Sequence, residues 1–416
     1  MAERNATEGL DERASVPSTG QPADGAQPSL AAKFSYGYRI LPSYFWQRLT
    51  RRQARGRVHL IIAVADHFEP SIVAENGSRY APYDEQERRV DFWFRKYPQL
   101  ADAWRDSDGR PFVHTYFYPA EQYDRRLIQQ LAEFCNSGWG EIEIHLHHGI
   151  TASDTAENTR QQLVEFRDTL ASRHGCLSYL DGAGPARYAF VHGNFALANS
   201  ADGMFCGVDE EMQVLAQTGC YADMTLPTAP FHPAQISKIN SLYECDFALS
   251  QRAPHRRGRD LECGRRPAVF PLMIQGPIMP AFFSGPSCKV GIENGAITRN
   301  NPLSMRRLQL WKRASISVDG RPDWLFVKLH CHGMDPTQQD AVLGGAMQAF
   351  LRELVQGADA RNEVLHFVSA REMVNIILAA CDGREGNPGE YRDYRFCRRA
   401  SAHEVARSRE EAAVKS

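Results

Sequence analysis

Short apolar runs alternate with amphipathic segments along most of this chain, and this alternation restricts its fold more than any other feature. Residues 58–65 form a run rich in Val, Ile and Ala that is typical of a buried strand, and residues 85–105 follow with apolar side chains at helical spacing. A second strong strand is predicted at 324–330, before a helix at 338–355. Repeated strand–helix units predict an α/β fold with a mainly parallel sheet.

About seven such units favour a (β/α) barrel, closed or nearly closed, with a doubly wound open sheet as the alternative. Asp154 followed by Glu157 resembles a capping box at the start of one of the helices. Further strands are expected at 112–118, 141–147, 188–192, 221–226, 268–275, 289–292 and 364–368, and further helices at 121–134, 155–173, 210–217, 303–314 and 370–380.

The two ends of the chain differ from its middle in composition. Residues 1–33 are rich in small, polar and acidic residues and lack aromatic side chains, so we expect them to be disordered. Residues 398–416 read as a flexible charged tail. The sequence therefore predicts one barrel domain over 34–397, with a loop insertion at about 250–300. Its basic stretch 251–266 is interpreted as a surface loop, with a site for an anionic sugar or lipid phosphate as the alternative.

Composition excludes several classes of protein. The formal net charge of −2 gives no broad basic field, which argues against a nucleic-acid partner. The N-terminal residues lack the apolar core of a signal peptide, and no apolar run approaches the roughly 20 residues of a membrane helix. We therefore expect a cytoplasmic protein without an integral membrane segment, whose 10 Cys are reduced. The sequence does not specify the oligomeric state.

Ionisable side chains gather where the predicted strands end. Asp66 and His67 directly follow the first apolar strand. In parallel α/β barrels the carboxyl ends of the strands form the mouth, where reactive groups collect. Two ionisable groups at such a position are costly to desolvate unless they are used or paired.

Three histidines end the third strand, as His145, His147 and His148. His145 and His147 share a face of the strand, and His148 begins the turn. Imidazole nitrogens at this spacing can converge on one cation, and neutral His suits Zn, Ni, Co or Fe. The spacing thus predicts a site for a divalent metal, with zinc as the first choice.

A late strand presents Lys328, His330 and His332 on one face. A Lys beside two His on a barrel face is costly unless it meets an anionic substrate or a carboxylate. Weaker signals come from His192 with Asn194, and from Asp223 in Cys-Tyr-Ala-Asp. Each of these lies at a strand end, where it could bind substrate or satisfy loop backbone.

Five short motifs span nearly the whole ordered chain: Asp-His-Phe-Glu-Pro at 66–70, His-Leu-His-His at 145–148, Val-His-Gly-Asn at 191–194, Gly-Cys-Tyr-Ala-Asp at 219–223 and Val-Lys-Leu-His-Cys-His-Gly at 327–333. With them the chain resembles the polysaccharide deacetylase superfamily, of the chitooligosaccharide-deacetylase type, and within it a bacterial deacetylase-like branch. The resemblance implies a (β/α) barrel, often with seven strands, and a metal-dependent hydrolase.

The resemblance also implies roles for individual residues. Asp66 corresponds to the catalytic base, and His67 stands where the family has a metal-binding Asp. His145 corresponds to a metal ligand, and four residues later comes Gly149, so the second ligand is His148 or, by the strand-face argument, His147. The late Leu-His gives His330 as general acid, with His332 as the alternative. No Arg-Pro motif follows, and residues 192–194 are expected to take its place.

The leading hypothesis is removal of an acetyl group from an N-acetylated sugar, polysaccharide or glycolipid precursor, as in exopolysaccharide assembly. His192, Asn194, Asp223 and Lys328 are then expected to contact the carbohydrate. A barrel glycoside hydrolase is the first alternative and needs two carboxylates across the bond, such as Asp66 with Glu69 or Asp223. The second alternative is a non-catalytic carbohydrate-binding protein.

Overall fold

The computed structural model describes residues 30–54, 56–73, 80–228, 232–283 and 289–398. The segment 1–29 and the tail 399–416, both expected to be disordered, lie outside the described residues. Helix α1 spans Leu30–Thr50 and so begins inside the segment 1–33. Its first residues, Leu-Ala-Ala-Lys, are good helix formers and continue into the aromatic stretch.

The centre of the fold is strand β1 (Val58–His67), which is parallel to all its neighbours. On one side it pairs along its length with β12 (Trp324–Cys331). On the other side its first half pairs with β13 (Glu363–Phe367) and its second half with β2 (His114–Pro119). Parallel strands buried on both faces read as continuous apolar runs, which is why β1 and β12 were visible in the sequence.

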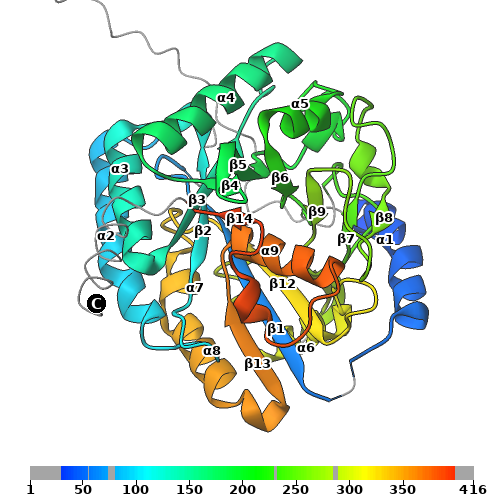
Figure 1. Cartoon of the computed structure of the whole chain (residues 1–416). Coiled ribbons are helices and arrows are strands. Elements are labelled where there is room, and N and C mark those ends of the chain that lie inside the picture. Colours follow the sequence, from blue (N-terminus) through cyan, green and yellow to red (C-terminus); the bar gives the residue numbers. More distant parts are fainter. Residues whose placement is uncertain (1–29, 55, 74–79, 229–231, 284–288, 399–416) are drawn as a thin grey trace, which may run out of the picture.

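The rest of the sheet continues from β2 in the order β3, β5, β6, β9, β7, β8 (Figure 1). Pairing is parallel as far as β9, and β7 and β8 are antiparallel at the far edge. Strands β10 and β11 form a separate antiparallel pair. The bounds are β3 Gly140–Leu146, β4 Ser178–Leu180, β5 Ala183–His192, β6 Cys220–Asp223, β7 Leu242–Glu244, β8 Arg259–Asp260, β9 Leu272–Ile274, β10 Met279–Phe283, β11 Lys289–Glu293 and β14 Phe396–Cys397.

The described strands do not close into a barrel, which corrects that expectation. The hydrogen-bonded order runs from β12 to β8 without a ladder joining these ends. At its open edge, β12 instead makes a single bridge from His330 to Ala296, in an irregular segment after β11. Within the expected loop insertion at 250–300, the strand expected at 268–275 contains β9, which belongs to the central sheet. The fold is thus an α/β structure around a large, mainly parallel, open sheet.

Helices cover the sheet (Figure 1), and side chains cap the starts of α3, α4 and α9. Ser369 and Glu372 form a capping box on α9. Helix α4 is capped by Thr155, so the expected box from Asp154 to Glu157 is wrong. The helix expected at 338–355 is broken at Gly344 into α7 and α8. The bounds are α2 Tyr83–Ala101, α3 Arg125–Phe134, α4 Ala156–Arg173, α5 Glu211–Thr218, α6 Met305–Ala314, α7 Gln339–Leu343, α8 Gly345–Gln356 and α9 Ala370–Cys381, with short helical turns η1 Ala120–Gln122, η2 Cys135–Trp139, η3 Leu197–Asn199, η4 Pro254–Arg256, η5 Asp359–Arg361 and η6 Pro388–Tyr391.

The two faces of the sheet bury different cores, and this separates neighbouring residues of β1. Val64 belongs to the core shared with α2, α3 and α4, which we call the outer face. Ala65 belongs to the core shared with α9, which we call the inner face. Because side chains alternate along a strand, Asp66 follows Val64 to the outer face and His67 follows Ala65 to the inner one.

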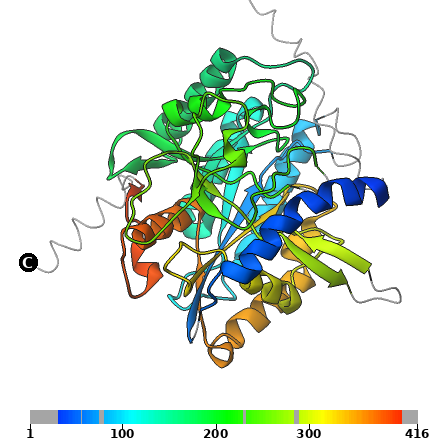
Figure 2. The same ribbon diagram turned by 90° about the vertical axis from the view of Figure 1, so that its right-hand side faces the viewer.

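Two expectations from composition bear on the described residues. All nine described cysteines are free thiols, seven of them buried. Over the part of the chain that the structure describes, none of the helices has the length and apolar character needed to cross a bilayer. Helix α1 lies on the outside of the molecule, beside the β10–β11 pair (Figure 2).

Candidate functional site

Histidines from three strand ends meet above the inner face of the sheet. His67 ends β1, His145 lies in β3, and His332 directly follows β12. The ring centroid of His67 lies 4.8 Å from that of His145 and 4.7 Å from that of His332. His330 lies somewhat further from His67, at 6.4 Å, and His147 packs 4.5 Å from His145. We call these five residues the histidine group.

Glu69 brings a carboxylate into the histidine group. Its Oε1 lies 3.2 Å from the Nε2 of His145 and 3.8 Å from the Nε2 of His147. Glu69 is buried, and it lies only two residues beyond His67, in the turn after β1. One ligand atom each from His67, Glu69 and His145 lie within 4.8 Å of one another.

The other ring nitrogens of these histidines determine what faces Glu69. The Nδ1–H of His145 donates to the carbonyl of Val191 at 2.8 Å, and the Nδ1–H of His147 donates to Glu121 Oε1 at 2.7 Å. The neutral ring of His145 therefore turns its Nε2 lone pair toward the carboxylate of Glu69. Two electron-rich atoms at this separation need a cation between them, which is either a proton or a metal ion. Burial opposes a charge on His147, but Glu121 and Glu69 outweigh it and raise the pKa of His147 above its ordinary value.

The pKa shifts follow this arrangement. Burial alone would raise the pKa of Glu69, but His147 and His145 outweigh it and lower that pKa to about 2. Burial, together with its neighbour His147, lowers the pKa of His145. Burial also lowers the pKa of His67 well below its ordinary value, helped by His332. At neutral pH the Nε2 of His145 thus faces an ionised carboxylate without a proton of its own.

The donor set fits a divalent metal ion. Imidazole and carboxylate together suit zinc and the neighbouring first-row metals. Metal-binding histidines usually donate their second ring N–H to a carbonyl or carboxylate, as His145 does to Val191 and His147 to Glu121. The Nδ1 of His67 is buried and has no hydrogen-bond partner among the described residues. These features make His67, Glu69 and His145 a candidate metal centre.

Asp66 does not join the histidine group. Its carboxylate lies on the outer face, where Oδ2 accepts from the Nδ1–H of His114 at 3.0 Å and Oδ1 accepts from the backbone N–H of Gly333 at 2.7 Å. Cys331 completes this buried cluster of Asp66, His114 and Cys331. The structure therefore places the residue predicted as catalytic base beneath the end of β12, and Glu69 is the carboxylate that reaches the histidines.

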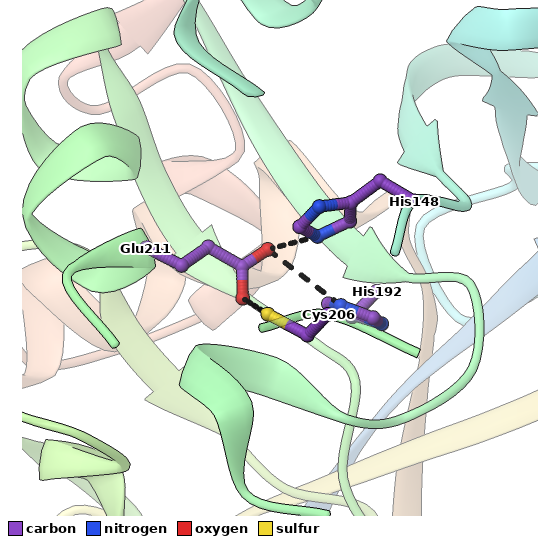
Figure 3. Close-up of side chains that lie close together, drawn as sticks. All are labelled: His148, His192, Cys206 and Glu211. Atoms are coloured by element: carbon purple, nitrogen blue, oxygen red, sulfur yellow. Dashed lines mark hydrogen bonds and ion pairs between the residues drawn. The ribbon is translucent and has the colours of Figure 1, made fainter. Parts of the chain in front are cut away.

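His148 also departs from its predicted partner His145. The turn after β3 directs it into a separate buried cluster with His192, Cys206 and Glu211 (Figure 3). Its Nε2 lies 3.0 Å from Glu211 Oε1, and its Nδ1 lies 2.9 Å from Asp154 Oδ2. Since both partners can only accept, both ring nitrogens carry protons, and His148 is an imidazolium in this arrangement. Burial opposes that charge, but Glu211 and Asp154 hold the pKa of His148 well above its ordinary value.

The cluster of His148, His192, Cys206 and Glu211 could also hold a metal ion, but each of its candidate ligand atoms except the Nε2 of His192 already has a hydrogen-bond partner among the described residues. Glu211 Oε2 accepts from the backbone N–H of Ala198 at 2.6 Å and from the thiol of Cys206 at 3.4 Å. The Nδ1 of His192 accepts from the N–H of Asn194, so the ring proton lies on Nε2, which is 3.7 Å from Glu211. A proton on that nitrogen blocks it as a ligand. The cluster is therefore best described as a buried ion pair with hydrogen bonds.

The residues expected to contact substrate, His192, Asn194, Asp223 and Lys328, are all buried. The Nζ of Lys328 donates to the carbonyls of Met224 and Leu226 at 2.6 and 2.7 Å and so ties β12 to the loop after β6. Burial lowers the pKa of Lys328 to about 7 and raises that of Asp223 to about 7, although the two attract each other. Asn194 is buried, with its Oδ1 unpartnered among the described residues.

Sequence reasoning missed three carboxylates of these sites. In the sequence, Glu69 fits only the glycosidase alternative, Glu121 falls inside an expected helix, and Glu211 is one of two acidic residues at the start of another. Glu121 in fact lies in the turn η1 directly after β2, and Glu69 lies in the turn after β1. The strand-end rule applied to Asp66 and His67 would have selected both had it been extended two residues into each loop.

Comparisons with known proteins leave the chain without an assigned family. No protein-family model matches it, and no curated protein matches it. One solved structure to which it is similar is an alpha-mannosidase from Enterococcus faecalis V583, with a TM-score of 0.34 and 11% identity over 77% of this chain and 29% of that one. The chain thus spans less than a third of the mannosidase. A TM-score this low carries no argument on fold or chemistry.

Proposed function

We propose that this protein is a metal-dependent hydrolase that removes N-acetyl groups from a carbohydrate, with its metal ion held by His67, Glu69 and His145. The observation that carries the proposal is the 3.2 Å approach of the His145 Nε2 lone pair to the ionised Glu69 carboxylate. The resemblance to polysaccharide deacetylases supports the substrate class. When bound, the metal ion supplies Lewis acidity to the site.

His147 is proposed as the general base. Its Nδ1–H is held by Glu121, which orients the ring and stabilises the imidazolium that forms when Nε2 takes a proton from water. Its Nε2 lies 3.8 Å from Glu69 Oε1, at the edge of the proposed metal site. In this proposal His147, supported by the carboxylate of Glu121, takes the role of base that the sequence predicts for Asp66.

His332 is proposed as the general acid that protonates the departing amine. The side chain of His332 is half-buried, and its ring lies 4.7 Å from that of His67. His330 is less suited, because burial and nearby Lys328 hold its pKa well below its ordinary value and keep it neutral. An imidazole that does not bind a proton cannot deliver one.

Phe195 offers an apolar surface for a sugar ring beside the histidine group. It is half-buried, and its ring lies 6.1 Å from that of His67 and 5.7 Å from that of His232. Its φ of 61° is unusual for a residue with a bulky side chain. Such a conformation is retained where the surrounding structure enforces it, often at functional sites.

Metal analysis of matched variants tests the site. After chelation and reloading with zinc, cobalt or nickel, wild type should bind one equivalent, while Glu69→Gln and His145→Ala should lose at least about tenfold in affinity. Glu211→Gln is the matched control, because it removes a buried carboxylate from the neighbouring cluster. Acetate release from a panel of N-acetylated oligosaccharides should follow metal content. Full metal occupancy in Glu69→Gln, together with loss of metal in Glu211→Gln, would place the metal in the cluster of His148, His192, Cys206 and Glu211 and contradict the proposal.

A further inference from the structure

Helix α1 carries an exposed apolar stripe that the fold does not use. Tyr38, Leu41, Phe45, Trp46 and Leu49 are 60%, 40%, 59%, 68% and 84% exposed. They account for half of the ten large apolar side chains that are exposed in the described part of the chain. Their spacing along α1 places them on one side of the helix.

The opposite side of α1 fastens the helix to the molecule. Ile40 is buried against Ile239 and Ile278. Gln47 Nε2 donates to the carbonyl of Ile239 at 2.6 Å, and the guanidinium of Arg51 donates to the carbonyls of Ala314 and Asn240 at 2.7 and 2.5 Å. The exposed stripe is therefore presented on a fixed helix at the surface (Figure 2).

The surroundings of the stripe are strongly cationic. Residues 30–57 contain seven Lys and Arg and no Asp or Glu, although the chain as a whole has a net charge of −2. Arg48, Arg52 and Arg313 form no ion pair with any described residue. Arg48, Arg51 and Arg313 line a cavity of about 270 Å³ beside the helix, and none of its described lining residues is acidic.

We propose that α1 docks this protein onto a membrane surface that contains anionic phospholipid. The aromatic and Leu side chains of the stripe enter the interface between headgroups and acyl chains, with the helix axis in the membrane plane. Arg48 and Arg313 receive a lipid phosphate in the cavity beside the helix. Apolar burial and attraction to anionic headgroups are the two terms that determine the binding of such helices.

The other occupants of this face fit it less well. A second copy of the chain would bring two cationic surrounds together, which like-charge repulsion disfavours. The segment 1–29 has acidic residues to match the arginines, but its large apolar residues are only Met1, Leu10 and Val16. It cannot cover a stripe of three aromatic and two Leu side chains.

Vesicle flotation of the full-length protein tests the proposal without reference to enzymatic activity. The protein should float with vesicles of phosphatidylcholine containing 30% phosphatidylglycerol and remain unbound with phosphatidylcholine alone. Trp46→Ser should weaken binding about tenfold or more. Arg48→Glu should weaken it by at least about fivefold, and added salt should weaken wild-type binding.

Matched variants elsewhere control for general effects. Phe247→Ser removes another exposed ring, and Arg173→Glu reverses another exposed arginine without a described ion pair, so both should bind like wild type. Absence of flotation by the wild type overturns the proposal. So does a dimer in sedimentation velocity that Trp46→Ser dissociates, or binding that appears only after residues 2–29 are deleted. None of these results affects the proposed hydrolase, whose test is metal content and acetate release.

Discussion

Replacing Gly193 with Ala tests the proposed base through a single methyl group. Gly193 follows β5, and its N–H donates to the carbonyl of Leu146 at 2.8 Å. A Cβ at this position would lie 2.2 Å from Cδ2 and 2.7 Å from Nε2 of the His147 ring. Its φ lies outside the left-handed region, so the backbone accepts Ala, and the cost falls on the histidine.

The size of the effect follows from these distances. Ordinary contact begins at 3.4 Å, so the ring must move by 3.4 − 2.2 = 1.2 Å. A shift of that size disturbs the 2.7 Å bond between His147 Nδ1 and Glu121 Oε1. Misplacing a catalytic group by about 1 Å can cost about 100-fold in rate. Weakening a hydrogen bond to a charged group costs about 1.5–3 kcal/mol of stability.

The assay is acetate release under saturating metal, with metal content measured in parallel. Gly193→Ala should lower kcat about 100-fold and keep the metal, because the three atoms nearest to the added Cβ all belong to His147, which is not one of the proposed ligands. Gly345→Ala is the matched control, since nothing lies within 4 Å of its added Cβ and its backbone is unstrained. Wild-type turnover in Gly193→Ala, or an equal loss in Gly345→Ala, would refute the assignment of His147 as base.

Three further predictions concern buried groups outside the proposed metal centre. Asp66→Asn should retain metal and reduce kcat by less than Glu69→Gln does, because Asp66 only positions the end of β12 through Gly333. If Asp66→Asn instead abolishes turnover with metal fully bound, Asp66 is the base. Glu211→Gln should lower the free energy of unfolding by about 3 kcal/mol in urea titration at pH 7, because it leaves the buried His148 imidazolium without its main partner. The pKa of Glu211 is lowered to about 2, so the ion pair contributes its full stability above pH 4.5 and loses it as pH falls through 2. An unchanged stability at pH 7 would contradict this prediction. His255 is buried with both ring nitrogens unpartnered among the described residues, and burial lowers its pKa to about 3. Because the folded protein keeps His255 neutral, the free energy of unfolding should fall by about 1.4 kcal/mol per pH unit as pH drops below 6.5. His255→Leu should therefore flatten the acid side of a plot of stability against pH, and an unaltered slope would count against this reasoning.

The sequence predicted the elements of the sheet better than its closure. Continuous apolar runs located β1 and β12, because strands buried on both faces need them. Closure depends instead on tilt and register between strands that are far apart in the chain, which no local pattern encodes. The short strands β7 and β9 also carry little periodicity, since each has three residues. The strand expected at 268–275 does contain β9, whereas β7 falls outside every expected strand.

The candidate site was predicted by residue type but not by face. The strand-end rule selected His67, His145 and His332, which do meet. The same rule grouped Asp66 with His67, although consecutive residues of a strand point to opposite faces. The alternation of side chains along β3 correctly predicted that His145 and His147 lie on the same face. Where the strand ended, the rule no longer applied, and the turn sent His148 elsewhere.

The separation of His147 from His148 suggests how the fold holds its proposed base in place. His148 is anchored from two sides, by Asp154 ahead of α4 and by Glu211 at the start of α5. This buried ion pair immobilises the turn directly after His147, while Glu121 fixes the His147 ring from the β2 side. Buried ion pairs often add little stability over apolar packing, but they do specify geometry. A catalytic imidazole must keep its position to within a fraction of an ångström, so a rigid charged neighbour serves it better than an apolar one.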